Sequence, residues 1–178
     1  MTAAKRKVVE FAYPRYWFLI IAVVFESLAI YLFVFALMDP DAVLRGAWLV
    51  LGPAIGVFVF LFMVPPLFTK HLAGERALRI KMGLLIDATV PYAVVKEVKD
   101  TTVHRGGVRV GIGVRYFPIS KAMFVTSSFS DLVMIRFHDE MLMGRLVKKP
   151  VEELVMSVNN KSLFIETVKV KAGLMKEV

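Results

Sequence analysis

Two long apolar stretches near the N-terminus constrain this chain more than any other feature. The first runs from Tyr16 to Leu37 and the second from Ala47 to Phe68, with a short polar break between them. Each stretch meets the roughly 20 residues that a membrane-spanning helix needs. The sequence therefore predicts a transmembrane hairpin over residues 16–68, followed by a domain outside the bilayer.

Composition supports this division of the chain. Hydrophobic residues make up 57% of the 178 residues and the mean hydropathy is +0.65, which is too apolar for an ordinary soluble domain. The part from His71 onward has the size of one compact domain. The chain contains no cysteine, so disulfides, cysteine-based metal sites and a thiol nucleophile are excluded.

The positive charges near the two spans predict the orientation. The outer ends of the spans are flanked by Lys5, Arg6, Lys7, Arg15, Lys70, Arg76, Arg79 and Lys81. The connection between the spans offers only Arg45. The positive-inside rule then predicts a multi-pass protein of the cell membrane with both termini in the cytoplasm. A cleaved signal peptide is the competing interpretation, but the first apolar run is too long and lacks an A-x-A-like cleavage site.

One acidic residue interrupts the first apolar stretch. Glu26 lies near its middle, where a carboxylate costs about 2.5 to 3.5 kcal/mol on insertion scales. The helical rise places Gly56 of the second span near the same level. Gly52 and Gly56 form a small-xxx-small face that lets helices approach closely. We expect Glu26 to be a neutral hydrogen-bonding group at this face, and the open alternative makes it part of an ion or proton path.

Strand-like patterns follow the hairpin. Apolar residues alternate from Ala77 to Met82 and from Leu84 to Val90, and Gly83 joins the two segments. Five more segments follow: Val94 to Val103, Val108 to Tyr116, Lys121 to Ser127, Asp131 to His138 and Met141 to Val147. The dipeptide Asp139-Glu140 between the last two is typical of a turn. The sequence therefore predicts seven short strands.

The pattern then changes to a helical period. Pro150 suits the first turn of a helix, and Glu152 and Glu153 complement the positive end of its dipole. The apolar residues at helical spacing are Val151, Leu154, Val155 and Val158. We expect a helix over residues 150–158 to close the domain. Residues 159–178 either continue that helix or form an extended tail.

Several of these segments resemble a known family. The run GGVRVGIGVRY from Gly106 to Tyr116, the segments KAMFVTSS and LVMIRF, and GRLVKKPVEELV from Gly144 to Val155 are similar to bacterial and archaeal pleckstrin-homology-like (PH-like) membrane proteins. The resemblance covers roughly residues 71–158 and rests on fold-forming glycines and hydrophobic residues. It implies an α+β membrane protein, with a seven-stranded PH-like β-barrel or sandwich and a C-terminal helix after the two-helix hairpin. It also implies a binding or scaffolding module rather than an enzyme.

The expected organisation has five parts. They are a basic cytoplasmic N-terminus (1–15), the transmembrane hairpin (16–68, with spans 16–37 and 47–68), a linker (69–76), a PH-like cytoplasmic domain (77–158) and a C-terminal tail (159–178).

The glycine-rich strand is the predicted binding surface. Alternation places one set of side chains on the same face: Arg105, Gly107, Arg109, Gly111, Gly113 and Arg115. Arginines beside a bare strip of backbone suit an anionic headgroup, an acidic peptide or another strand. The alternative is that the glycines only allow the barrel to bend. We therefore expect ligand or partner binding at Arg105, Arg109, Gly111, Gly113 and Arg115.

Other functional classes find little support. From His71 onward there are 17 Lys and Arg against 11 Asp and Glu, a difference of 17 − 11 = +6, which favours contact with anionic lipid. The three histidines, His71, His104 and His138, fit no metal-ligand spacing. The sequence has no phosphate loop, no nucleophile elbow and no basic helix typical of nucleic-acid binding. We expect no metal, no cofactor, no nucleic-acid partner and no enzymatic activity.

Two functional hypotheses remain. The first is a non-enzymatic, membrane-anchored PH-like module that binds or scaffolds a protein partner or an anionic headgroup at the cytoplasmic face. The second is a small accessory subunit of a membrane transporter or channel, with Glu26 in an oligomeric hairpin. The expected partners are membrane lipids and either another protein or further copies of the chain.

Overall fold

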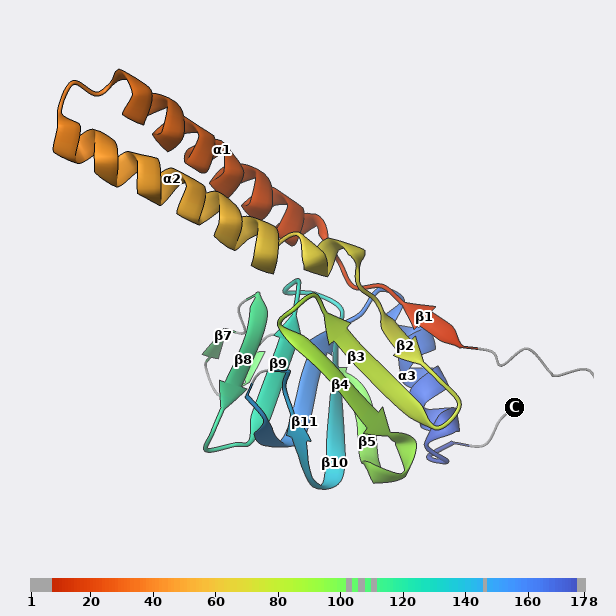
Figure 1. Cartoon of the computed structure of the whole chain (residues 1–178). Coiled ribbons are helices and arrows are strands. Elements are labelled where there is room, and N and C mark those ends of the chain that lie inside the picture. The colour runs from red at the N-terminus through yellow and green to blue at the C-terminus, as the bar shows by residue number, and fades with distance from the viewer. Residues whose placement is uncertain (1–7, 102–103, 106–107, 110–111, 146, 176–178) are drawn as a thin grey trace, which may run out of the picture. The chain divides into compact units, whose positions relative to one another are not determined.

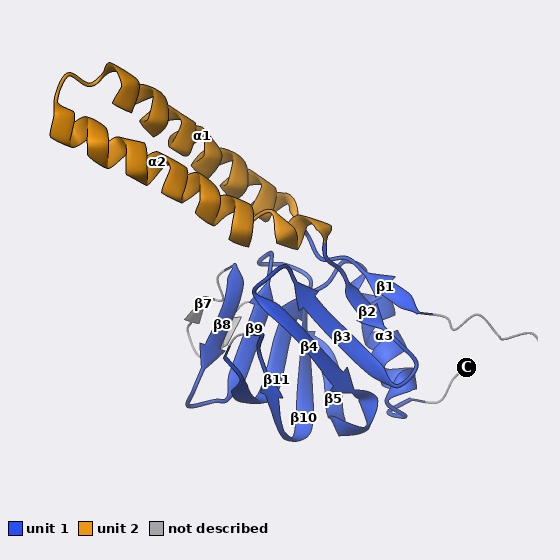
Figure 2. Cartoon of the chain, in the orientation of Figure 1, with its two compact units in different colours: residues 1–14, 69–178 blue, residues 15–68 orange. Residues whose placement is uncertain are grey.

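A computed structural model describes residues 8–101, 104–105, 108–109, 112–145 and 147–175. For residues 104–105 and 108–109 it describes the backbone alone. The chain divides into two compact units, shown in different colours in Figure 2. Residues 15–68 form one unit, which we call the hairpin. Residues 1–14 and 69–178 form the other, which we call the head.

The hairpin consists of two long apolar helices. α1 (Tyr16–Met38) and α2 (Ala42–Phe62) are followed by the short 3₁₀ helix η1 (Pro65–Phe68). Both long helices are sufficiently apolar to cross a membrane, and only 17% and 11% of their most apolar windows are buried. α2 begins at Ala42 rather than at the expected Ala47 because Asp41 caps it. The Asp41 Oδ1 accepts hydrogen bonds from the Val43 amide at 2.8 Å and the Leu44 amide at 3.1 Å.

Small residues form the contact between the two helices. Ala22, Ala29 and Ala36 recur every seven residues on α1, and all three are buried. On α2, a Cβ added at Gly52 would lie 3.0 Å from the Ala29 carbonyl oxygen. A larger residue here would push the neighbouring backbone away by a few tenths of an ångström, and small residues at such crossings let helices pack closely in membranes.

The chain segments before and after the hairpin pair with each other within the head. β1 (Val9–Phe11) pairs with β2 (His71–Ala73) in antiparallel register. The Tyr13 hydroxyl and the Thr69 Oγ1 are 2.7 Å apart, and Lys70 Nζ lies 2.6 Å from Glu10 Oε2. The segments expected to be a basic N-terminus (1–15) and a linker (69–76) thus each contribute a strand to the head.

β2 continues into a four-stranded sheet of order β1-β2-β3-β4. The two strands predicted on either side of Gly83 are confirmed: β3 (Ala77–Met82) is paired to β4 (Ile86–Pro91), with a turn at Gly83, whose φ is +54°. The predicted alternation on β3 is confirmed as well, because Leu78, Ile80 and Met82 are all fully buried. Figure 1 shows β3 and β4 lying across the face of a second sheet.

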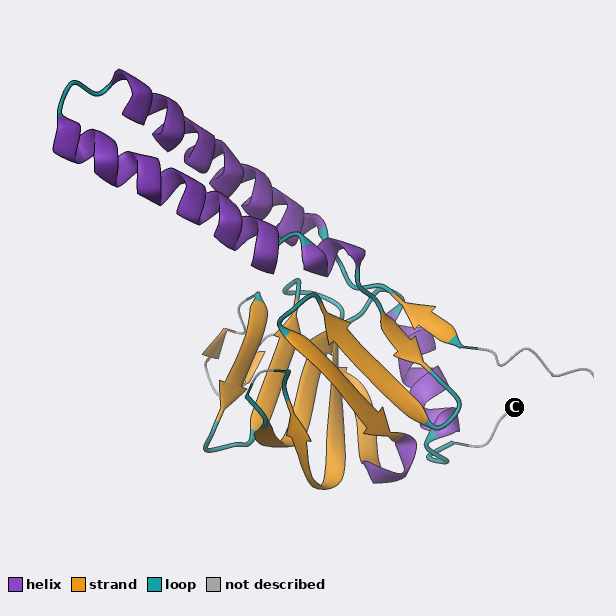
Figure 3. Ribbon diagram, in the orientation of Figure 1, coloured by secondary structure: helices purple, strands orange, loops and turns teal. Residues whose placement is uncertain are grey.

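The second sheet has five strands in the order β5-β10-β11-β9-β8. Its strands are β5 (Val95–Thr101), β8 (Gly113–Phe117), β9 (Ala122–Thr126), β10 (Leu132–Met143) and β11 (Lys149–Ser157), and the short helix η2 (Tyr92–Val94) precedes β5. Among the strand pairs of the described residues, β11 and β9 alone run parallel. β6 (His104–Arg105) and β7 (Val108–Arg109) form a separate pair. The expected single seven-stranded barrel is wrong, because the described residues form sheets of four, five and two strands (Figure 3).

The position of the C-terminal helix also differs from the expectation. Residues 150–158, predicted to be helical, lie almost wholly in β11, a central strand with neighbours on both sides. The helix is α3 (Lys161–Lys171), inside the segment expected to be a tail. Phe164 of α3 packs edge-on against Phe11 at a ring-centroid distance of 4.9 Å. The coarser expectation is confirmed: the chain is α+β, with two apolar N-terminal helices, then sheets, then a C-terminal helix.

Candidate functional site

The glycine-rich strand does not form as one element. The expected strand from Val108 to Tyr116 is wrong, because Val108–Arg109 pairs with β6 whereas Gly113–Phe117 pairs with β9. Arg109 and Arg115 therefore belong to different sheets. The side chains of Arg105 and Arg109, and the whole of Gly111, lie outside the described residues.

The two remaining residues of the predicted surface are described. Arg115 is exposed on β8, an edge strand of the five-stranded sheet. Gly113 begins β8 with a φ of +112°, and a Cβ added there would meet nothing within 4 Å. Its backbone angle, and not a close neighbour, is the reason for glycine at this position. This observation favours the interpretation that the glycine serves chain bending.

The structure brings the three hairpin residues singled out in the sequence close together. A Cβ added at Gly56 would lie 3.4 Å from the Glu26 Oε2, so the Glu26 carboxyl rests over Gly56. Gly52 lies one turn away, against the backbone of Ala29 and Phe33. The glycines thus provide the space in which α1 and the Glu26 side chain lie against α2.

A cleft of about 540 Å³ in the head is lined mostly by charged side chains. It forms where β10 loses register with both neighbours. Against β11, the pairing jumps from Arg136↔Glu153 to Met141↔Val151, so residues 137–140 bulge opposite a single residue, Glu152. Against β5, the register shifts between Arg136 and Phe137, which pair with Glu97 and Val95. Lys96 therefore has no pairing partner on β10. Bulges re-aim side chains, and they are common next to functional sites.

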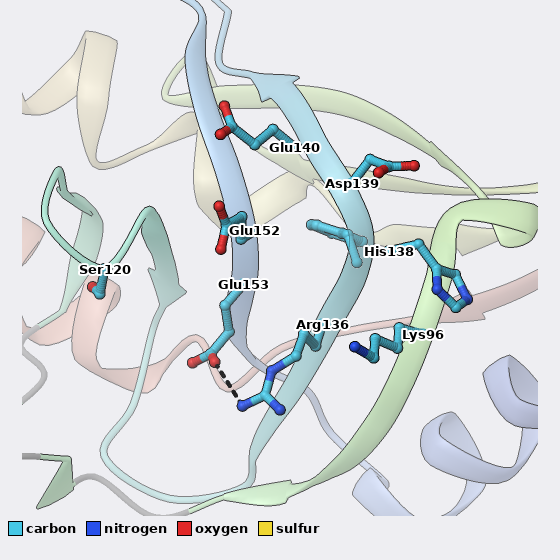
Figure 4. A pocket seen from close by; sticks show the side chains of 9 residues that line it. Lys96, Ser120, Arg136, His138, Asp139, Glu140, Glu152 and Glu153 are labelled. Atoms are coloured by element: carbon cyan, nitrogen blue, oxygen red, sulfur yellow. Dashed lines mark hydrogen bonds and ion pairs between the residues drawn. The ribbon is translucent and has the colours of Figure 1, made fainter.

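Nine residues line this feature, which we call the acidic cleft: Lys96, Ser120, Arg136, Phe137, His138, Asp139, Glu140, Glu152 and Glu153. Four carboxylates against two cations give a formal charge of 2 − 4 = −2, in a chain whose formal charge is +8. In Figure 4, Glu140, Glu152 and Glu153 project from one side of β10 and β11, whereas His138 and Asp139 project to the other.

Lys121, in the turn before β9, links two acidic residues that line the cleft. Its Nζ makes ion pairs with Glu140 and, at 2.9 Å, with Glu152. Its carbonyl oxygen also accepts a hydrogen bond of 2.9 Å from the Glu152 amide. The hydrogen bonds to Glu140 and Glu152 raise the pKa of Lys121 above its ordinary value. Lys121 therefore stays charged and reduces the net charge of the cleft to −1.

Arg136 lines the cleft and contacts two carboxylates. Its guanidinium lies 3.3 Å from Glu97 Oε2 and 3.5 Å from Glu153 Oε2. Glu153 is 5% exposed on the central strand β11, so its carboxylate depends on nearby cations and donors. The pKa of Glu97 is lowered by the hydrogen bond from Lys99, and the charge of Arg136 adds to that effect.

The arrangement is suited to binding charged groups. Among the described residues there is no cluster of three or more His, Cys, Asp or Glu side chains that could hold a metal ion. The carboxylates of Glu140 and Glu152 are engaged by Lys121, but Asp139 is exposed at the rim of the cleft. The cleft thus offers carboxylate acceptors to a ligand with cationic groups.

The acidic cleft was missed in the sequence for a definite reason. Asp139 and Glu140 were expected to form a turn, but they lie inside the long strand β10 as part of its bulge. The run of three polar residues from His138 to Glu140 between two apolar segments was the available signal. No protein family, curated protein or solved structure was found to match the chain.

Proposed function

We propose that this chain is a non-enzymatic, membrane-anchored module with a PH-like head, and that its acidic cleft binds a basic segment of a protein partner at the cytoplasmic face of the membrane. The observation that carries the proposal is the cleft, a cavity of about 540 Å³ built by two coincident breaks in strand register. Bulges are over-represented next to functional sites, and this one places four residues of β10 opposite a single residue of β11.

The hairpin supports the anchoring part of the proposal. Its outward-facing side chains are large and apolar, for example Ile30, Val50 and Phe60 at 63%, 71% and 66% exposure. Such exposure is costly in water and favourable in lipid. The pairing of β1 with β2 joins the chain segments at both ends of the hairpin within one unit. This is expected if both ends lie on the same side of a bilayer.

The architecture of the head supports the PH-like assignment. A PH-like domain implies two packed antiparallel sheets closed by a C-terminal helix, and the head has two layered sheets followed by α3. The parallel pairing of β11 with β9 and the five-strand count of the second sheet depart from the expected pattern. The PH-like assignment therefore supports a fold and a general binding role, and it does not identify a specific ligand.

The charge of the cleft supports a basic segment as the ligand. Asp139 presents an exposed carboxylate at the cleft, while Lys121 pairs with Glu140 and Glu152 and Arg136 pairs with Glu153. Lysine or arginine side chains of a partner would gain charge-assisted hydrogen bonds there. Complementary charge also speeds association and excludes acidic partners.

Photo-cross-linking in native membranes tests the proposal. A photoreactive amino acid replaces His138, an exposed residue that lines the cleft. In the positional control, the same photoreactive amino acid replaces the exposed Glu166 of α3. We expect a discrete adduct with another protein from position 138. Asp139→Lys should reduce that adduct about tenfold, equivalent to about 1.4 kcal/mol of binding, whereas Glu166→Lys should leave it unchanged. Recovery of self-adducts alone would contradict the recruitment of a different protein.

One observation favours the second candidate, an accessory subunit of a transporter or channel. The carboxyl of Glu26 rests on Gly56 within the apolar hairpin, where an acidic residue is costly and is often functional. The transporter hypothesis requires Glu26→Gln to abolish an ion or proton flux in reconstituted vesicles. The binding-module proposal requires that this substitution leave partner adducts unchanged.

A further inference from the structure

One end of the five-stranded sheet carries exposed apolar side chains next to lysines. Ile119, in the turn between β8 and β9, is 102% exposed, and Leu142 and Val147 are 67% and 63% exposed. Lys148 and Lys149 follow Val147 directly and are also exposed. We call these five residues the apolar-basic rim.

Strand pairing places the members of the rim at the same end of the sheet. Leu142 pairs with Pro150 across the β10–β11 hairpin, whose connection holds Val147 and Lys148. The turn that holds Ile119 lies beside the start of β11, because the Lys121 carbonyl oxygen accepts a hydrogen bond from the Glu152 amide. The Tyr116 hydroxyl donates a 2.9 Å hydrogen bond to the Pro150 carbonyl and joins the two connections further.

Both connections contain tight turns next to the exposed side chains of Ile119 and Val147. Lys121 has a φ of +44° and its amide bonds to the Pro118 carbonyl, which closes a tight turn around Ile119. Gly144 has a φ of +125°, and a Cβ there would lie 2.3 Å from the Val147 carbonyl oxygen. Only glycine can occupy that position, so the chain turns sharply just before Val147.

Three of the carboxylates near the rim are already engaged by other cations. Glu140 and Glu152 are paired with Lys121, and Asp87 forms a 2.7 Å ion pair with Arg79. The charge of Arg145 also lowers the pKa of Asp87, after the larger effect of the Arg79 hydrogen bond. The charges of Lys148 and Lys149 therefore remain available to a negatively charged surface.

We propose that the apolar-basic rim docks on an anionic lipid bilayer, so that the head contacts the membrane a second time, apart from its hairpin. Three separate apolar side chains, two in turns and one near the end of β10, are too small a surface for a standard protein interface, which buries roughly 800 Å² per partner. A bilayer accepts such side chains individually, and lysines next to them are attracted to anionic headgroups. Tethering through the hairpin raises the effective concentration of the rim at the lipid surface, so weak contacts suffice.

The absence of cysteine from the chain makes a site-specific test direct. The full chain with Ile119→Cys is labelled with an environment-sensitive fluorophore and reconstituted in nanodiscs of phosphatidylcholine, with or without phosphatidylglycerol. The exposed Thr89 of β4 provides the control label site as Thr89→Cys. The inference rests on anchoring by the hairpin, which co-purification of the chain with the discs reports separately. It does not depend on the acidic cleft.

We expect the label at position 119 to shift to shorter wavelength, and to be quenched by nitroxide-labelled lipid, in the discs that contain phosphatidylglycerol. Adding Lys148→Glu with Lys149→Glu should abolish both effects, whereas Lys169→Glu on α3 should preserve them. Equal emission in both lipid compositions, or emission that matches the label at position 89, would overturn the proposal. A shift that depends on protein concentration in detergent without lipid would also overturn it and would assign the rim to contact between copies.

Discussion

At the scale of single residues, His71 shows how burial sets the acid sensitivity of the head. The ring is fully buried, its Nδ1 accepts a 3.3 Å hydrogen bond from the Lys81 amide, and it lies 5.1 Å from the ring of Tyr13. Burial lowers the pKa of His71 from 6.5 to about 3, against a smaller opposing effect of the Ser157 backbone. The neutral ring is thus part of the interface between β2, β3 and β11.

The lowered pKa of His71 predicts a loss of stability in mild acid. The unfolded chain binds a proton near pH 6.5 that the folded chain binds only near pH 3. Stability is therefore complete above pH 6.5 and falls as the pH drops from 6.5 toward 3, by about 2 kcal/mol at pH 5. Urea unfolding of the full chain at pH 7 and pH 5 measures the difference. His71→Gln should flatten this pH dependence, and the exposed-site control His138→Gln should retain it; equal slopes in both variants would refute the assignment.

Arg136 and Glu153 provide a second prediction at this scale. Replacing Arg136 leaves the buried Glu153 carboxylate with one cation fewer, so Arg136→Met should lower the free energy of unfolding by about 2 kcal/mol at pH 7. The double variant Arg136→Met/Glu153→Leu should recover most of this loss, because it removes the stranded charge. Denaturant unfolding of the four chains of the cycle gives the coupling energy. Additive losses would show that the two side chains act independently.

At the scale of elements, the sequence predicts some parts well and others poorly for identifiable reasons. β3 alternates cleanly because one of its faces is buried, and its predicted bounds are those observed. β11 is buried on both faces from Glu153 onward, so its apolar run carries no strand period and is compatible with a helix. β1 and β2 are three residues long and lie on opposite sides of the hairpin in sequence, so no local pattern identifies them.

The crossing of α1 and α2 predicts different responses at the two hairpin glycines. A Cβ at Gly52 meets backbone atoms of Ala29 and Phe33 at 3.0 and 3.3 Å, which do not move aside, whereas at Gly56 it meets the flexible end of Glu26 at 3.4 Å. Gly52→Ala should destabilise the hairpin by about 1 to 2 kcal/mol, as overpacking exceeds the gain in helix propensity. Gly56→Ala should be neutral or stabilising. Thermal unfolding in detergent, followed by circular dichroism, measures both, and equal effects would contradict the crossing geometry.

At the scale of the whole molecule, the candidate site illustrates what local patterns omit. The arginine-and-glycine surface was inferred from alternation along one strand, but Val108–Arg109 and Gly113–Phe117 belong to separate sheets. The acidic cleft arises from register shifts between β5, β10 and β11, which are properties of pairing between distant segments. A register shift between distant strands produces no periodic pattern of apolar residues in the sequence. The polar run from His138 to Glu140 was therefore the one local indication of the site.

The proposed topology predicts the location of both chain ends. Basic residues flank the outer ends of the hairpin, and the β1–β2 pair joins the segments next to those ends, so the head and both termini should lie in the cytoplasm. A reporter enzyme that is active only in the cytoplasm, fused after Val178, should be active. A reporter that is active only after export should be silent at the same position, and robust export would overturn the topology.

The most direct test compares Asp139→Lys with Glu26→Gln in native membranes and in vesicles that contain the purified protein. Two quantities are measured for each chain: the partner adduct from the photoreactive residue at position 138, and the ion or proton flux of vesicles that contain the purified protein. We predict that Asp139→Lys reduces the adduct about tenfold, and that Glu26→Gln changes neither the adduct nor the flux. Loss of flux in Glu26→Gln, with the adduct unchanged in Asp139→Lys, would contradict the account and assign the function to the hairpin.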